Sequence, residues 1–146
     1  MSFNWSFEVE GSAEQMKTEL HANGHTIVIS EPEDMGGKDE GLDPLSTFLS
    51  SLAGCENVIA NMVAKEIDFD LKSIGFTVKG ELDSRGLLGQ EGVQPYFHTV
   101  YIDAEVNTSE SQARIDELRE KVDARCPVYT TLEAAGVELK TNWTKA

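Results

Sequence analysis

Two cysteines, Cys55 and Cys126, are the residues of this 146-residue chain best suited to carry chemistry. Cys55 lies in the run SSLAGCENVIANM, where Glu56 follows it in otherwise uncharged sequence. Cys126 lies in ARCPVYTTL, directly before Pro127. A thiol can act as a nucleophile, bind a metal or join a disulfide, and it can equally be a small core residue. The surroundings of each cysteine indicate which of these roles is open.

The two cysteines differ in their predicted helical position. Pro127 cannot lie inside a helix and favours its first position, so Cys126 is predicted at a helix N-cap. Backbone N–H groups there favour the thiolate and lower its pKa, and Arg125 adds to this effect. Cys55 is predicted in mid-helix, without such help. Glu56 points about 100° away from it and has two open roles: pairing with a cation across an interface, or facing an exposed rim.

Several function classes are disfavoured by the remaining sequence. We find no CxxC or HExxH, and the three histidines (His21, His25 and His98) share no ligand spacing, so we expect no metal and no cofactor. A cysteine hydrolase would need a histidine base near the thiol, and none has a recognisable context. The net charge of −14 disfavours nucleic-acid and membrane binding. With no apolar run of about 20 residues and no signal peptide, we expect a cytoplasmic protein.

The elements that must position the cysteines begin with a predicted three-stranded meander. Residues 3–9 alternate apolar and polar side chains, which is typical of a half-buried strand. A turn at Gly11-Ser12 would lead into a second strand around residues 16–20. Asn23-Gly24 is a strong hairpin signal, and a third strand is predicted over residues 25–30.

A long apolar helix is predicted over residues 44–64. Asp43 followed by a proline is a good helix start, and Glu56 is the only charge within the helix. A helix this apolar should be buried on most sides, and Gly54 should allow close approach of another backbone or a ligand. The acidic, glycine-rich segment 31–43 before it is predicted as a loop, either a solvated connection or a flap over a site.

The second half of the chain alternates strands and helices. A capping box at Ser109 and Gln112 predicts a helix start, and a shorter helix should begin at Pro127 and end before Gly136. The order βββ-α-ββ-αα-β predicts a single α+β domain over residues 1–146. The remaining strands are predicted over residues 74–82, 100–106 and 137–143.

Three segments together resemble a known family. GGKDEGLDPLSTFLSSLAGCENVIANMVAKE, IGFTVKGELDSRG and ARCPVYTTL, in this order, are similar to the signatures of the OsmC/Ohr proteins, the osmotically inducible and organic hydroperoxide resistance proteins. The resemblance implies an OsmC-like swapped homodimer, in which antiparallel sheets wrap around a buried central helix from each subunit. It also implies that Cys55 is the peroxidatic cysteine and Cys126 the resolving one. An external thiol or dithiol would reduce the disulfide between them.

The sequence departs from this family at the residues that activate the reactive cysteine. The peroxidases carry an arginine in the N-terminal hairpin region and a glutamate after the proline that starts the central helix. Here Leu45 follows the proline, and no arginine precedes Arg85. Arg85 and Arg125 are the candidates for its replacement. Two functions therefore stay open: a thiol-dependent peroxidase for organic hydroperoxides, and a non-catalytic dimer that binds an apolar ligand at the subunit interface.

Overall fold

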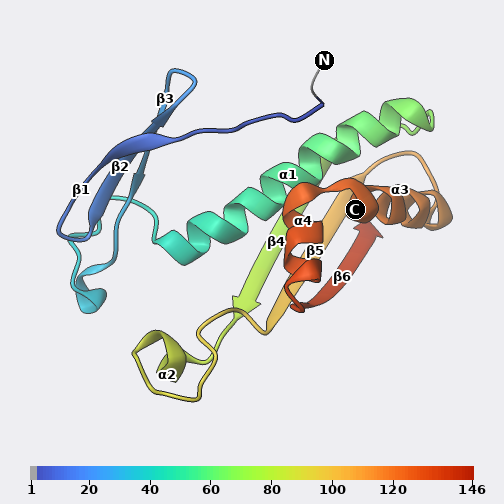
Figure 1. The fold of residues 1–146 in the computed structure, drawn as a ribbon. Helices are drawn as coiled ribbons and strands as arrows, with labels where there is room; N and C mark the ends of the chain where they lie inside the picture. Colours follow the sequence, from blue (N-terminus) through green and yellow to red (C-terminus); the bar gives the residue numbers. More distant parts are fainter. Residues whose placement is uncertain (1–2) are drawn as a thin grey trace. The chain divides into compact units, whose positions relative to one another are not determined.

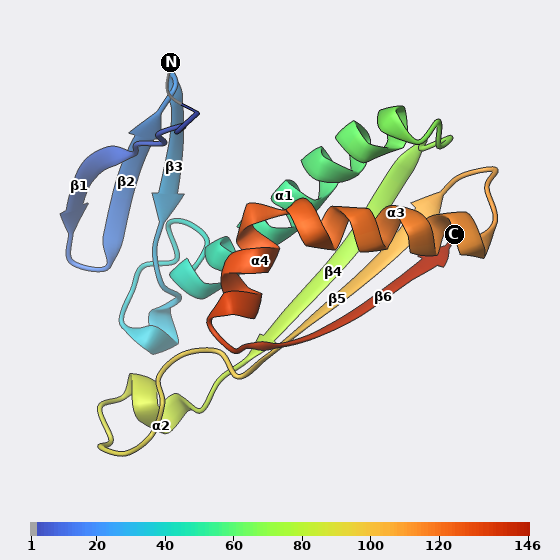
Figure 2. The ribbon, with the colours of Figure 1, turned by 45° about the vertical axis from the view of Figure 1, so that its right-hand side comes forward.

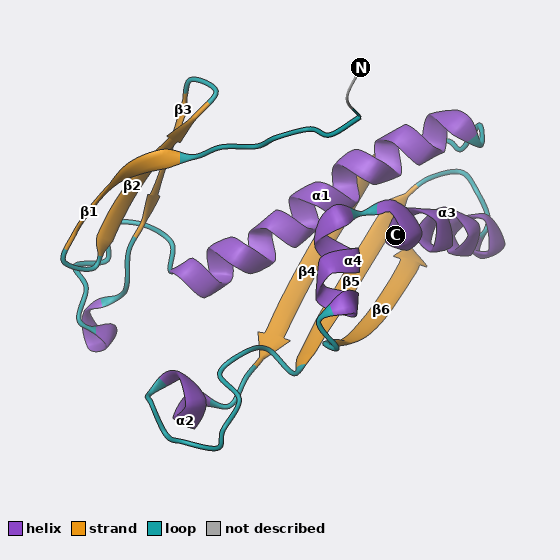
Figure 3. Cartoon of the chain, in the orientation of Figure 1, coloured by secondary structure: helices purple, strands orange, loops and turns teal. Residues whose placement is uncertain are grey.

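The computed structural model describes residues 3–146, which fall into two compact units, residues 3–48 and 49–146. Figure 1 traces the chain through both units, and Figure 3 distinguishes helices from strands. Each unit has its own three-stranded sheet. Among the described residues, no helix is both long and apolar enough to cross a membrane.

The first unit is an antiparallel meander. It comprises β1 (Glu10–Glu14), β2 (Lys17–Ala22) and β3 (His25–Ile29), paired in sequence order. Asn23 and Gly24 link the last two strands with positive φ angles of 52° and 79°. Two consecutive positive φ angles are what a two-residue hairpin turn requires, and they confirm the turn predicted from the sequence.

The predicted strand over residues 3–9 is wrong for this chain. The segment pairs with no strand among the described residues, and its four apolar side chains are 62% to 91% exposed. The first strand begins at Glu10 and includes Gly11 and Ser12, which were expected to turn the chain. The turn instead lies at Gln15, whose φ is 55°. Alternation predicts an extended backbone, but a strand also needs a neighbour to pair with.

The long helix begins where the sequence predicts. Asp43 Oδ2 accepts the backbone N–H of Ser46 at 2.9 Å, and α1 then runs from Pro44 to Glu66. The hydrogen bonds to Ser46 hold the pKa of Asp43 below its usual value. In the preceding loop, a single 3₁₀ turn, η1, covers Glu33–Met35. Asp43 is therefore a true N-cap that fixes the start of the helix.

The second unit contains a mixed sheet in the order β4-β5-β6. Its strands are β4 (Ser73–Glu81), β5 (Thr99–Asn107) and β6 (Glu138–Lys145), and a short helix, α2 (Ser84–Leu87), lies between the first two. β4 and β5 are antiparallel, but β5 and β6 are parallel. This corrects the expectation of purely antiparallel sheets. The two helices between β5 and β6 bring the chain back to the same end of the sheet, as a parallel pair requires.

Those two helices are α3 (Gln112–Arg125) and α4 (Pro127–Ala134). The predicted capping box is wrong by two residues, since Ser111 and not Ser109 is the N-cap of α3. Ser109 Oγ instead donates to the carboxylate of Asp70 at 2.6 Å. Both serines precede the helix at suitable spacing, and this tertiary hydrogen bond occupies the first of them.

One face of the second sheet is covered by helices. Helices α1, α3 and α4 lie over this face (Figure 2). From Val100 on, alternate side chains of β5 are buried in the core and the intervening ones are more exposed. The alternation is the period of two expected for a sheet with one face in the core. The buried residues of β5 on this face are Val100, Ile102, Ala104 and Val106.

Within the chain α1 is buried along one side and exposed along the other. Val58 and Met62 on the outer side are 51% and 49% exposed. Nothing in the described chain lies within 4 Å of where a Cβ on Gly54 would be. The expectation that the helix is buried on most sides is therefore not met by this chain alone. The buried residues of α1 are Leu52, Glu56, Ala60, Val63 and Ala64.

Candidate functional site

Cys126 lies at the junction of two helices, as the sequence predicts. It is the N-cap of α4, with Pro127 at the first helical position. Its Sγ accepts the backbone N–H of Tyr129 at 3.5 Å. The side chain is fully buried. The N-cap therefore fixes where the sulfur points, into the core of the second unit.

Cys55 reaches the same part of the core from α1. Its side chain is half-buried and packs against the apolar cluster to which Cys126 belongs. The two thiols are close enough for a hydrogen bond between them to influence the pKa of Cys126, and neither is in a disulfide. The structure thus brings together two cysteines that lie far apart in the sequence. Other members of this cluster are Leu49, Leu52, Ile59 and Phe97.

The pKa of Cys126 corrects the expectation drawn from its helix position. Burial, followed by the hydrogen bond with Cys55, raises the pKa of this thiol to about 12. The N–H of Tyr129 opposes the shift but is outweighed, because removing a thiolate from water is more costly than one such contact can offset. Arg125, expected to help, instead binds the Glu66 carboxylate at 2.5 Å.

Glu56 is the least expected member of the site. It is fully buried, and neither carboxylate oxygen has a hydrogen-bond partner of good geometry in the described chain. An exposed rim, one of its two open roles, is therefore excluded. Burial, the charge of Asp123 and the neighbouring Asp123 side chain raise the pKa of Glu56 to about 8, while Cys126 and Arg119 act weakly in the opposite direction. At neutral pH Glu56 is mostly a neutral acid.

A second carboxyl group, Asp123 of α3, lies beside Glu56. It is 8% exposed, and its Oδ2 accepts from Arg119 at 3.2 Å, while Oδ1 has no partner. Burial raises the pKa of Asp123, and Glu56 and Arg119 oppose that rise. Two adjacent acids in a dry site ionise one at a time, because the second negative charge is repelled by the first. The arginine favours the charge on Asp123.

Sequence reasoning missed Asp123 and Arg119 entirely. Their spacing of four residues on one helix was the available signal, since such pairs face each other. The burial of Glu56 also had a signal, because Glu56 lies four residues after Leu52 and four before Ala60, both on the core side of α1. The position of Glu56 in the apolar stripe of α1 therefore indicated burial, whereas its charge suggested an exposed or paired side chain.

The two arginines considered as replacements are both engaged elsewhere. Arg85 forms a bidentate ion pair with Asp83 near α2, and Arg125 pairs with Glu66 at the end of α1. Both pairs are well exposed. The cation that the structure places close to the buried acids is Arg119. Within residues 3–146, no three histidine, cysteine or acidic side chains are grouped to hold a metal ion.

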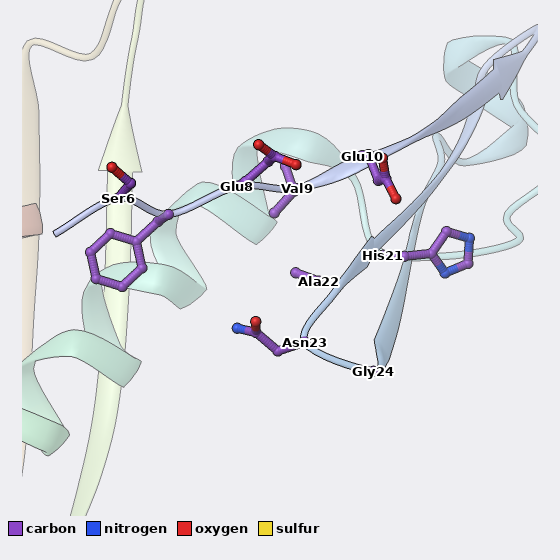
Figure 4. A pocket seen from close by; sticks show the side chains of 9 residues that line it. Ser6, Glu8, Val9, Glu10, His21, Ala22, Asn23 and Gly24 are labelled. Atoms are coloured by element: carbon purple, nitrogen blue, oxygen red, sulfur yellow. The ribbon is translucent and has the colours of Figure 1, made fainter.

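A hollow in the first unit is lined by neither cysteine. It has a volume of about 690 Å³ and lies between residues 6–10 and 21–24, at the tip of the β2–β3 hairpin (Figure 4). Its lining includes Phe7 and Val9, both strongly exposed. The side chains that could carry thiol chemistry lie in the cysteine cluster of the second unit.

Comparison with known proteins shows which sequences and folds this chain resembles. The sequence profile of the OsmC-like protein family matches residues 37–142, a span that includes both cysteines. A hydroperoxide reductase of Mycoplasma pneumoniae is 28% identical over 103 residues, covering 70% of each chain. One from Mycoplasma genitalium is 30% identical over 95 residues, covering 65% of this chain and 64% of that protein.

The fold also resembles that of a solved OsmC-like protein. The crystal structure of an OsmC-like protein from Mycoplasma pneumoniae superimposes with a TM-score of 0.83 at 20% identity, covering 99% of each chain. At this identity the likeness concerns the fold alone. Together with the sequence match over most of its length, it shows that the chain belongs to the OsmC-like protein family.

Proposed function

We propose that this protein is a thiol-dependent peroxidase that reduces organic hydroperoxides through Cys55 and Cys126. The observation that carries the proposal is the meeting of two free cysteines in one apolar cluster, one half-buried and one fully buried. Relatives named hydroperoxide reductases support the reaction class.

The difference in solvent exposure between the two thiols indicates which of them reacts first with the peroxide. A peroxide can reach Cys55, which is half-buried, more readily than Cys126, which is shielded from solvent. The Cys55 sulfur attacks the peroxide, the O–O bond breaks, and the products are Cys55 sulfenic acid and an alcohol. Cys126 then attacks the oxidised sulfur, releasing water and forming a disulfide. An external thiol or dithiol reduces this disulfide in two exchange steps.

The apolar lining favours an organic peroxide over hydrogen peroxide. Leu52, Ile59 and Phe97 pack in the same cluster as Cys55, so the surroundings of the sulfur suit an alkyl or aryl group. The exposed outer side of α1 favours a homodimer, because Val58 and Met62 would be covered by a second copy. The sequence departs from the family at the arginine and glutamate that activate the reactive cysteine, so we expect modest turnover.

Turnover of cumene hydroperoxide with dithiothreitol tests the proposal. The wild-type protein should consume peroxide catalytically, and Cys55→Ser should reduce the rate to the uncatalysed background. Equal rates for the two proteins would eliminate the peroxidase.

The second candidate is a non-catalytic dimer that binds an apolar ligand. The sequence departure at the activating positions, with Leu45 after Pro44 and no arginine before Arg85, favours it. In that case both thiols should remain titratable after hours with excess cumene hydroperoxide, and an apolar fluorescent probe should bind in proportion to dimer.

A further inference from the structure

Glu56 is a buried acid without a partner, next to a thiol that must lose a proton. An unsatisfied carboxyl group in a core is destabilising, and native structures retain such groups rarely. A leucine at this position would continue the apolar stripe of α1, and a glutamine would carry no charge. Two side chains from other elements are close enough to influence its pKa, that of Asp123 on α3 and that of Cys126, which caps α4.

Three helices supply the groups that influence Glu56. Asp123 faces it with a carboxyl group whose charge is favoured by Arg119. Of the two acids, Glu56 therefore holds the proton at neutral pH, in agreement with its pKa of about 8. The titratable and charged groups around Glu56 are Cys55 on its own helix, Asp123 and Arg119 on α3, and Cys126 and Tyr129 at the start of α4.

Disulfide formation requires a proton transfer at this place. When Cys126 attacks the Cys55 sulfenic acid, the S–O bond breaks and an S–S bond forms. The Cys126 thiol loses its proton, and the departing hydroxide must gain one to leave as water. With a pKa of about 12, the Cys126 thiol is almost never ionised at neutral pH, so an adjacent proton acceptor has a large effect.

We propose that Glu56 is the proton relay of this step. It gives its proton to the hydroxide that leaves Cys55 and takes the proton of the Cys126 thiol. Glu56 ends the step as it began, and the net change is one disulfide and one water. The proposal deepens the peroxidase function and rests on it. Asp123 is a positioning residue that keeps Glu56 protonated.

A single-turnover experiment separates this step from the peroxide reaction. Reduced full-length protein is mixed with one equivalent of cumene hydroperoxide between pH 5 and pH 10. Sulfenic acid is trapped with a dimedone probe, and disulfide is quantified by mass after alkylation. Glu56→Gln should slow disulfide formation at least about tenfold at pH 7, while sulfenic acid forms within about threefold of the wild-type rate. Glu66→Gln, an exposed acid on the same helix, is the control.

The pH dependence gives a readout that a structural role would not produce. The wild-type disulfide step should slow above about pH 8, where Glu56 loses its proton. In Glu56→Gln the rate should rise steadily with pH as Cys126 ionises. Asp123→Asn should shift the wild-type inflection to lower pH, because a negative neighbour is removed. Asp116→Asn, exposed on the same helix, should leave it in place.

The outcomes distinguish the relay from the peroxidase itself. If Glu56→Gln forms the disulfide at the wild-type rate with the wild-type pH profile, the relay is wrong and the peroxidase stands. If the wild-type protein forms neither sulfenic acid nor disulfide, both are wrong. Should Glu56→Gln fail to fold, Asp123→Asn decides, since an unshifted inflection overturns the relay.

Discussion

The two sides of α1 contrast in a way that ordinary amphipathic helices do not. The inner side, facing the core, carries the fully buried Glu56 with no hydrogen-bond partner. The outer side carries Val58 and Met62, each about half exposed. A typical surface helix places apolar residues inside and charges outside. Packing within the described chain accounts for neither side. We therefore propose that the inner side serves chemistry and that a partner subunit covers the outer side.

The largest expected effect concerns Cys126, which lies in the apolar cluster against which the inner side of α1 packs. Cys126→Ser removes the attacking sulfur, so Cys55 sulfenic acid should accumulate, and turnover with dithiothreitol should fall to about a tenth or less. Dimedone labelling of Cys55 after one equivalent of cumene hydroperoxide measures the first effect. Wild-type turnover together with no added labelling would mean that Cys126 is a packing residue.

The next test concerns the outer side. Val58→Asp places a charge where a second copy should pack, so the protein should become monomeric in light scattering at micromolar concentration. Gln90→Asp introduces the same charge on an exposed loop and should leave the mass at that of a dimer. A monomeric wild-type protein would refute the partner assigned to the outer side.

The pH dependence of stability tests the burial of Glu56. Its pKa in the folded chain, about 8, lies above the value of 4.5 expected when unfolded. Its stabilising contribution is therefore complete below pH 4.5 and is lost as the pH rises through 8, at up to about 1.4 kcal/mol per pH unit. Glu56→Gln should flatten the decline in unfolding free energy measured by urea denaturation from pH 5 to pH 8. Parallel curves for variant and wild type would place Glu56 in contact with water.

The smallest expected effect is a difference in unfolding free energy between substitutions at a buried and an exposed position of α1. Val63→Ala empties space in the core and should lower the unfolding free energy by about 2 kcal/mol. Lys65→Ala on the exposed surface should change it by less than about 0.5 kcal/mol. Urea denaturation measures both, and equal values would contradict the inside and outside assigned to this helix.

Local signals in the sequence predicted much of this fold. The cap at Asp43, the turn at Asn23-Gly24 and the N-cap at Cys126 each depend on neighbouring residues, and all three are confirmed. The proximity of the two cysteines was expected only through resemblance to a family.

What the sequence could not predict depends on distant partners. Residues 3–9 have the right period for a strand but pair with no strand among the described residues. The parallel pairing of β5 with β6 is not encoded in either strand. The raised pKa of Cys126 also could not be predicted from local sequence, because the burial that raises it comes from elements far along the chain. The neutral form of Glu56 depends first on burial and then on Asp123 of another helix, which the residues next to Glu56 in the sequence do not reveal.

The central claim is that Cys55 and Cys126 exchange oxidation states within one chain, and peptide mapping tests it most directly. Reduced protein at high dilution receives one equivalent of cumene hydroperoxide and is digested without reduction. We predict loss of both free thiols and a peptide pair joined by a Cys55–Cys126 disulfide in most of the protein. If Cys126 remains fully titratable while Cys55 is unmodified or oxidised alone, the two thiols do not act as a pair.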